Sequence, residues 1–363
     1  MSRVNVVIPC YNYGRFLSEC VTSALDDQPD TDVRVLIIDD ASQDDSAEIA
    51  HKLAAGDSRI EVAVHPVNRG HIATYNEGLL DWADGNYCVL ISADDRLAPG
   101  ALRRAADLMD AHPEVGFVYG HAVEFRDGEE PPPAQTRCRS QTIWPGHWWL
   151  ERRFREAHNC IFSPEVVVRT SLQHQVGGYD PDLYHTADAE MWMRLAAYAD
   201  VGYIRADQAY YRRHGSSMSG VLLGDDLLRL NQVRSAYEAV LKRCGEVLPN
   251  AAELSEIVHR QLAQDAMWIA ARAYDRRRTD RVAVGELAAF ALDCWPGAAS
   301  LNTYRSLQLR RRIGPTIMPY LRPLILPRLL SRDLSAVARH AKDRWWWRHS
   351  WKRQRHLTHT LTI

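Results

Sequence analysis

The sequence has few cysteines, and none of its 7 cysteines forms a CxxC pair. They are scattered along the chain: Cys10, Cys20, Cys88, Cys138, Cys160, Cys244 and Cys294. This pattern indicates neither a disulfide framework nor a structural zinc site, and it favours a reducing compartment. The sequence also lacks a Gly-x-Gly-x-x-Gly motif after a predicted strand, which argues against a dinucleotide-binding dehydrogenase.

Long hydrophobic runs are missing as well. The most apolar late stretch, residues 313–330, is interrupted by Arg322, Arg328 and four prolines, so it cannot supply the ~20 uninterrupted apolar residues of a membrane-spanning helix. The N-terminal apolar run is short and leads directly into a strand pattern, which is not typical of a secretory signal. We therefore expect a cytoplasmic protein without a transmembrane helix.

What the chain does contain is typical of a folded protein, with 46% apolar and 25% charged residues over 363 positions. This length predicts two domains, or one large domain with an appendage. Charge is unevenly distributed: residues 301–363 hold 14 Lys/Arg against 2 Asp/Glu, and residues 1–300 hold 30 against 44. An acidic body with a basic, Trp-bearing end is suited to meet an anionic surface.

The first 120 residues alternate between short β-branched runs and longer segments with helical spacing. Strands are predicted at 4–8, 33–38, 60–64 and 87–91, and crossover helices at 16–25, 46–54 and 72–82. This alternation predicts an α/β fold with a Rossmann-like, mainly parallel sheet flanked by helices. Because ligands bind beyond the carboxyl ends of the strands in such sheets, the site is expected at that edge.

The pattern changes in the second half of the chain. Residues 128–146, rich in Pro, Gly and polar residues, predict a long surface loop. A strand at 162–168, a helix at 188–199 and closing strands at 201–211 follow, and from 222 to about 292 the pattern is wholly helical. We predict three parts: an α/β domain at 1–220, a helical region at 221–300 and a basic, Trp-rich tail at 301–363.

Adjacent carboxylates follow two of the predicted strands. Asp94 and Asp95 come after an apolar strand, and they suit a hard cation such as Mg²⁺ or Mn²⁺, but Asp is equally common as a cap of the next helix. Asp39 and Asp40 follow the second strand with the same ambiguity. Asp40 could accept a hydrogen bond from an N–H of a nucleobase or from a sugar hydroxyl.

Four sequence blocks lie at or after the ends of the predicted strands: VVIPCYN at 6–12, IIDDASQD at 37–44, NRG at 68–70 and SADD at 92–95. Together they resemble the family 2 glycosyltransferases of the GT-A fold. Their order and spacing match the family as a set, which is more specific than any single block. The resemblance runs from residue 3 to about residue 220, and it implies a GT-A catalytic domain there.

The resemblance implies roles for individual residues. Pro9, Tyr11 and Asp40 would surround the base and ribose of a nucleotide, and a residue in the loop from Arg69 to His71 would complete that pocket. Asp94 and Asp95 would belong to the metal-binding motif, with Asp95 as the direct ligand. The family's usual motif has Asp where this chain has Ser92, which leaves the cation fewer carboxylate partners.

Two later blocks also resemble the family. ADAEMWMRL at 187–195 is similar to its catalytic block, which makes Asp188 the candidate base, although an ordinary first-turn Asp after Thr186 would give the same pattern. YRRHGSSMS at 211–219 resembles the segment that closes the catalytic domain, where His214 would approach the metal or the diphosphate. Arg212 or Arg213 could instead neutralise the diphosphate.

Aromatic residues precede the catalytic block. Trp144, Trp148 and Trp149 lie where the family's acceptor region would fall, and aromatic faces stack well on sugar rings. A tryptophan cluster is more often part of a core, and we take the core as the default. The stretch 158–163 lies in the same region.

Together these features predict an inverting glycosyltransferase that moves a sugar from a nucleoside diphosphate, UDP- or dTDP-linked, to an acceptor hydroxyl. The reaction would depend on Mn²⁺ or Mg²⁺. The acceptor would be an envelope glycan, a glycolipid or a natural product, and it could be linked to a lipid. The alternative is a non-catalytic nucleotide-sugar-binding or scaffold protein that retains the fold. A nucleotidyltransferase is disfavoured because no Gly-rich loop with lysine follows the first strand.

The C-terminal tail is basic and contains several tryptophans. Residues 342–355 combine Lys and Arg with Trp, a pairing that suits an anionic membrane surface. We expect peripheral attachment at the inner face of the membrane, with packing on the acidic body as the alternative and no nucleic-acid partner.

Overall fold

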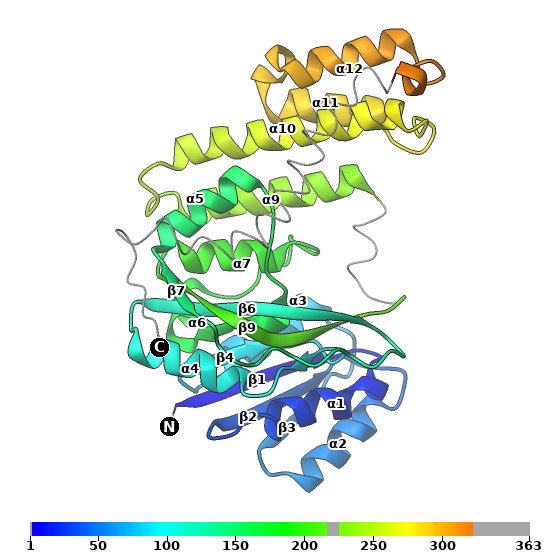
Figure 1. The fold of residues 1–363 in the computed structure, drawn as a ribbon. Coiled ribbons are helices and arrows are strands. Elements are labelled where there is room, and N and C mark those ends of the chain that lie inside the picture. Colours follow the sequence, from blue (N-terminus) through cyan, green and yellow to red (C-terminus); the bar gives the residue numbers. More distant parts are fainter. Residues whose placement is uncertain (1, 216–224, 322–363) are drawn as a thin grey trace.

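The computed structural model describes residues 2–215 and 225–321 of the chain (Figure 1). The membrane contact predicted for residues 342–355 therefore lies outside the described residues. The same holds for residues 216–219 of the segment that resembles the end of the catalytic domain.

A parallel sheet forms from the first four predicted strands. These are β1 (Arg3–Cys10), β2 (Asp32–Asp39), β3 (Ile60–Val64) and β4 (Tyr87–Leu90), joined by α1 (Gly14–Leu25), α2 (Ser46–Gly56) and α3 (His71–Asn76), which continues as a π-helical turn, η1 (Glu77–Trp82). Cys10 lies opposite Asp39 across the β1–β2 pair, and Val7 opposite Leu90 across the β1–β4 pair. The carboxyl ends of β1, β2 and β4 therefore lie at the same edge of the sheet.

The second half of the sheet is mixed. It contains β5 (Arg96–Leu97), β6 (Val115–Arg126), β7 (Gln141–Trp144), β8 (Val167–Arg169) and β9 (Asp200–Arg213), with α4 (Ala101–Ala111), α5 (Gly146–Glu156), η2 (Ser163–Glu165), α6 (Thr170–Val176) and α7 (Ala187–Ala196) between them. The strand order is β3-β2-β1-β4-β8-β6-β9-β5, and β7 pairs with β9. β8 runs antiparallel to β4 and β6. The predicted fold class, an α/β sheet flanked by helices, is confirmed.

Three details differ from the prediction. The strand β7 lies inside the segment 128–146 that was expected as a loop, because its residues pair with β9, a distant part of the chain. The segment expected as a strand at 162–168 begins as the 3-10 turn η2, which contains Pro164, and only the short β8 follows, because proline has no N–H for a sheet ladder. The long strand β6 was not predicted, since Gly116 and Gly120 weaken its pattern. A Cβ at Gly120 would lie 2.7 Å from the carbonyl oxygen of Ala206, so β9 approaches too closely for a side chain.

Helices alone follow the sheet in the described residues. They are α9 (Asp226–Cys244), α10 (Ala251–Asp275), α11 (Val284–Cys294), η3 (Pro296–Ser300), α12 (Asn302–Ile313) and η4 (Met318–Leu321). The Asp225 carboxylate caps α9 by accepting from the N–H groups of Leu227 and Leu228. This confirms the predicted helical C-terminal region. Among the described residues, no helix is both long and apolar enough to cross a membrane.

One hydrophobic cluster connects the sheet to these helices. It includes Phe117 of β6, Trp192 of α7, Tyr237 of α9 and Leu262 of α10. Figure 1 shows the corresponding layers, with α1 and α2 on one face of the sheet and α7, α9 and α10 stacked in turn on the other. Since the buried surface is continuous, α7 is held firmly against the sheet edge that carries the site. The domain boundaries expected at residues 220 and 300 stay a prediction.

Candidate active site

A cavity of about 230 Å³ opens at the carboxyl ends of β1 and β4. Five of the predicted site residues line it: Pro9, His71, Asp94, Asp95 and Asp188. They come from β1, α3, the loop after β4 and the start of α7. Carboxylates far apart in the sequence are therefore brought to one cavity, as ligand sites in such sheets require.

Asp94 and Asp95 are held by the end of β9. The backbone N–H of Arg212 donates to Asp95 Oδ1 at 2.9 Å, and Arg212 Nε donates to the Asp94 carbonyl oxygen at 2.9 Å. His214 Nε2 lies 2.8 Å from Asp94 Oδ2. Asp94 Oδ1, in contrast, is buried without a hydrogen-bond partner among the described residues. A buried acceptor of this kind is costly unless something else satisfies it.

The charge around this pair is strongly negative. Burial, with the neighbouring Asp94 carboxylate as the next cause, raises the pKa of Asp95 well above its usual value. Arg212 is a nearby cation, but its two terminal nitrogens pair with other carboxylates, donating to Glu19 Oε2 at 2.6 Å and to Asp127 Oδ1 at 3.2 Å. None of the described residues that line the cavity is Lys or Arg. The cavity therefore presents carboxylates without a matching protein cation.

This donor set fits part of the shell of a hard cation. Hard cations such as Mg²⁺ take carboxylate oxygens from one or two residues and fill their remaining positions with water and phosphate oxygens. Asp94 Oδ1 supplies an unused buried oxygen, and the Asp95 carboxylate is adjacent. No group of three or more His, Cys, Asp or Glu side chains arranged for a metal occurs in residues 2–215 or 225–321. A cation here would need ligands from a bound substrate.

Asp188 stands at the first turn of α7, on the same cavity. Its Oδ1 accepts from the Ala189 N–H at 2.7 Å, and its Oδ2 accepts from Asn159 Nδ2 at 2.9 Å. Burial raises the pKa of Asp188 to about 6. A carboxylate with a pKa near 6 is ionised at neutral pH and is a stronger base than an ordinary Asp, which suits proton abstraction.

Asp40 does not line the cavity. Its Oδ1 accepts from the Arg69 N–H at 2.8 Å and lies 2.7 Å from His65 Nδ1, and its Oδ2 accepts from the Gly70 N–H at 2.9 Å. Burial alone would raise the pKa of Asp40, but these hydrogen bonds together lower it. The carboxylate therefore anchors the loop that leads to His71.

Tyr11 and Arg69, which were also predicted to surround the nucleotide, do not line the cavity. The Arg69 guanidinium pairs with Glu77, and its side chain is half exposed. Tyr11 is 45% exposed and is not among the cavity residues. Direct contact of Tyr11, Asp40 or Arg69 with a ligand stays a prediction.

Replacing Asp40 with Ala tests its anchoring role. Three hydrogen bonds to a buried carboxylate would be lost, and we expect the free energy of unfolding to fall by roughly 2 kcal/mol or more. Urea denaturation measures this. Glu130→Ala removes an exposed carboxylate from a surface loop and should change stability by less than about 0.5 kcal/mol. Equal stability of the two variants would contradict the anchoring role.

Aromatic rings that no sequence pattern indicates form much of the cavity lining, and we call them the aromatic wall. Six rings line the cavity in addition to the histidines His71 and His185: Tyr13, Tyr75, Phe162, Tyr179, Tyr184 and Tyr211. The His71 and Tyr184 rings meet edge-on with centroids 4.5 Å apart. These residues are spread along the chain, so only folding brings them together. Asn159, the donor to Asp188, lies in the stretch 158–163 but without a predicted role.

The three tryptophans at 144, 148 and 149 differ in burial. Trp144 and Trp149 are buried in the hydrophobic cluster, as the default expectation had it, whereas Trp148 is 39% exposed. None of the three lines the cavity.

Comparison with known proteins identifies the family. The model of glycosyl transferase family 2 matches residues 5–170. Residues 5–170 of this chain therefore form a glycosyl transferase family 2 domain. The match includes Pro9, Asp40, Asp94 and Asp95 and ends before Asp188.

Two characterised glycosyltransferases show how far the similarity extends. Poly(ribitol-phosphate) beta-N-acetylglucosaminyltransferase TarS of Staphylococcus aureus is 24% identical over 238 residues, which cover 62% of this chain but 38% of TarS. The crystal structure of TarS residues 1–349 in complex with UDP-GlcNAc has a TM-score of 0.57 at 16% identity, covering 84% of this chain and 91% of that one. A mannosyltransferase of Pyrobaculum calidifontis in complex with GDP-Man and Mn²⁺ has a TM-score of 0.50 at 17% identity, covering 88% of this chain and 85% of that one. The structural likeness shows a shared fold.

Proposed function

We propose that this family 2 glycosyltransferase is a metal-dependent, inverting enzyme that transfers a sugar from a nucleoside diphosphate to an acceptor hydroxyl. The observation that carries the proposal is that Asp94, Asp95 and Asp188 line one cavity. The Asp94 and Asp95 carboxylates are suited to hold a cation that binds the diphosphate, and the Asp188 carboxylate is suited to act as the base that deprotonates the acceptor. Their retention argues against a non-catalytic scaffold.

Electrostatics support the need for a cation. A diphosphate entering the cavity would face three carboxylates, and no Lys or Arg is found among the described residues that line it. Like charges in a partly buried site repel strongly. A divalent cation held by Asp94 and Asp95 would turn this repulsion into attraction, and the contact of His214 Nε2 with Asp94 Oδ2 would hold that carboxylate in place. When bound, the cation would stabilise the negative charge of the departing diphosphate.

Asp188 would act on the acceptor. Its ionised carboxylate would accept the proton of the acceptor hydroxyl while that oxygen attacks the anomeric carbon and the bond to the diphosphate breaks. A single in-line displacement of this kind inverts the anomeric configuration. The Ala189 N–H and Asn159 Nδ2 hold the two carboxylate oxygens, so the base is oriented before the acceptor binds.

The donor proposed is a UDP- or dTDP-linked sugar. The fold shared with TarS, whose structure holds UDP-GlcNAc, supports a uridine nucleotide. The acceptor proposed is a hydroxyl of an envelope glycan or of a lipid-linked glycan, and the aromatic rings of the cavity offer faces on which a sugar ring can stack.

Turnover of a nucleotide-sugar panel by the purified full-length chain tests this function. We expect hydrolysis or transfer from at least one UDP- or dTDP-sugar with Mn²⁺ or Mg²⁺, and loss of that activity with a chelator. Inversion is checked by the anomeric configuration of the product. Activity that is unchanged by the chelator would contradict metal dependence, and nucleotide-sugar binding without turnover would favour the scaffold.

The pH dependence of turnover tests the role of Asp188. Because its pKa is raised to about 6, kcat/KM should fall as the pH drops through that value and the base becomes protonated. We call this fall the acidic limb of the pH profile. Asn159→Leu removes a donor that stabilises the ionised carboxylate, so it should raise the pKa of Asp188 and move the acidic limb to higher pH by roughly one unit.

The control for this experiment is Asn302→Leu, which changes an exposed asparagine on α12. It should leave the acidic limb where it is in the unmodified enzyme. If Asn159→Leu lowers kcat/KM equally at every pH, Asn159 has only a structural role.

A further inference from the structure

The far end of the helical layer carries a dense group of exposed arginines. Arg276, Arg277 and Arg278 follow α10, Arg281 lies in the next turn, and Arg311 and Arg312 belong to the last turn of α12. We call these six residues the arginine surface. Among the described residues, Asp280 is the one carboxylate that forms an ion pair with any of them.

Two contacts bring the ends of α10 and α12 together. The Arg310 guanidinium donates to the Asp275 carboxylate at 2.9 and 3.1 Å, and both side chains are buried. The Arg277 guanidinium lies 5.0 Å from the centroid of the Tyr320 ring. Figure 1 shows the yellow end of α10 and the orange η4 at the same end of the helical layer. The arginines therefore form one surface, although they come from two separate segments.

Apolar side chains are exposed beside these arginines. Tyr320 is 72% exposed and Ile317 is 55% exposed. Cations interspersed with an aromatic and an aliphatic side chain are typical of surfaces that meet lipid headgroups, because the ring and the aliphatic group enter the interface while the cations pair with anionic lipids. A surface that binds the phosphate backbone of a nucleic acid gains nothing from an exposed aliphatic side chain such as Ile317.

The body of the molecule has the opposite charge. Residues 1–300 carry an excess of Asp/Glu, 44 against 30 Lys/Arg, although they include four of the six arginines of this surface. An anionic membrane would therefore attract the arginine surface and repel the acidic body, which orients the protein as well as binding it.

We propose that the arginine surface, with Tyr320 and Ile317, docks the enzyme on membranes that contain anionic phospholipids. This surface is separate from the cavity, so the proposal does not depend on the proposed chemistry. For an acceptor carried in the membrane, docking replaces a search through solution by a search along the surface.

Sedimentation of the full-length protein with vesicles tests the proposal. The protein should bind vesicles of phosphatidylcholine that contain phosphatidylglycerol, and bind much more weakly to phosphatidylcholine alone. Each basic residue contributes about fivefold to such binding, so Arg276→Glu together with Arg278→Glu should weaken it by at least roughly 25-fold. Added salt should weaken the binding of the unmodified protein.

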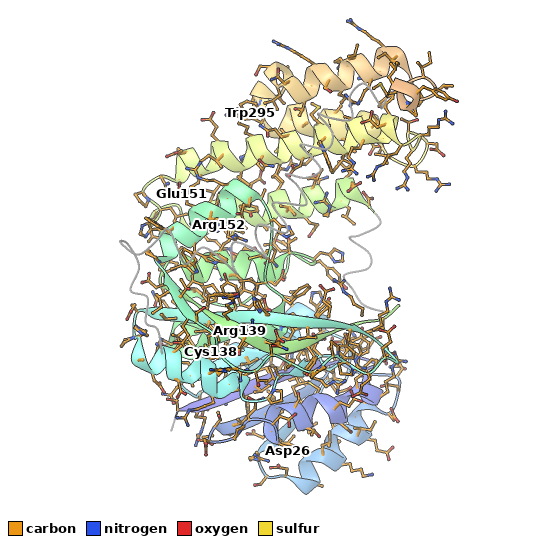
Figure 2. The ribbon with its side chains drawn as sticks, viewed as in Figure 1. Asp26, Cys138, Arg139, Glu151, Arg152 and Trp295 are labelled. Atoms are coloured by element: carbon orange, nitrogen blue, oxygen red, sulfur yellow. The ribbon has the colours of Figure 1, made fainter. Side chains whose placement is uncertain are left out.

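The matched control is Arg137→Glu together with Arg139→Glu, which makes the same charge change on exposed residues. Figure 2 shows Arg139 beside the sheet, whereas Trp295 marks the helical layer. The control should bind the anionic vesicles as the unmodified protein does. Neither double variant should alter turnover of a water-soluble donor and acceptor, which separates this proposal from the proposed function.

Two results would overturn the proposal. One is equal binding of the Arg276/Arg278 variant and the unmodified protein to the anionic vesicles. The other is a preference for duplex DNA or RNA over the anionic vesicles at the same salt concentration, which would assign the surface to nucleic acid.

Discussion

Replacing Asp188 with Asn should reduce sugar transfer by about 10²- to 10⁴-fold while leaving nucleotide affinity unchanged. The amide has nearly the shape of the carboxylate, but it cannot take up the acceptor proton. Asp188 lies on α7, whereas the carboxylates proposed to meet the cation and diphosphate follow β4. The loss should therefore appear in kcat and leave binding of the nucleotide intact, as measured by calorimetric titration.

Asp182→Asn is the control for this variant. Asp182 is exposed in the turn that precedes α7, so the same chemical change there should leave kcat within about twofold. Circular dichroism would establish that both variants fold. Near-normal turnover of Asp188→Asn would remove Asp188 as the base, and a parallel loss of nucleotide binding would place it in the donor site instead.

The second large effect is expected at Asp95. Asp95→Asn keeps an oxygen to accept the Arg212 N–H but removes a negative charge next to Asp94. If the cation bridges these carboxylates to the diphosphate, turnover should fall by about 10²- to 10³-fold, the usual cost of losing a central electrostatic stabiliser. Nucleotide affinity in Mn²⁺ should fall to the level that the unmodified enzyme shows with a chelator.

Thermal unfolding with UDP gives an independent measurement of the same effect. Ligands that bind only the folded state raise the melting temperature, so Mn²⁺ and UDP together should stabilise the unmodified enzyme and not Asp95→Asn. Asp107→Asn, on the exposed face of α4, should behave like the unmodified enzyme. A full Mn²⁺-dependent shift in Asp95→Asn would show that the cation does not bind through this carboxylate.

The first half of the fold could be predicted from the sequence because its strands are short, β-branched and buried. The runs 4–8 and 33–38 are central strands covered on both faces, and such strands appear as continuous apolar segments. β6 could not be predicted in the same way. Its glycines are required by close contacts from distant parts of the chain, such as the approach of β9 to Gly120, and no local pattern reveals those contacts.

The candidate site could be predicted in outline. Adjacent carboxylates at a strand end and an Asp at a helix start are local signals, and the structure brings Asp94, Asp95 and Asp188 to one cavity. Sequence alone could not show that Asp40 is already occupied by the loop of Arg69 and Gly70, because that depends on how the loop folds back.

The aromatic wall escaped prediction for a similar reason. Its residues come from positions as distant as Tyr13 and Tyr211, and tyrosines at such spacing carry no periodic signal. The hydrogen bond from Asn159 to Asp188 also joins two elements that only tertiary packing places side by side.

The central claim is that Asp94 and Asp95 hold a cation that binds the diphosphate, while Asp188 in the same cavity faces the acceptor. Anomalous scattering from crystals grown with Mn²⁺ and UDP tests this claim most directly. The account predicts a strong manganese peak in contact with the Asp95 or Asp94 carboxylate and with the diphosphate oxygens, and it predicts that Asp188 does not coordinate the metal. UDP bound in the cavity without such a peak, or manganese coordinated by Asp188, would contradict it.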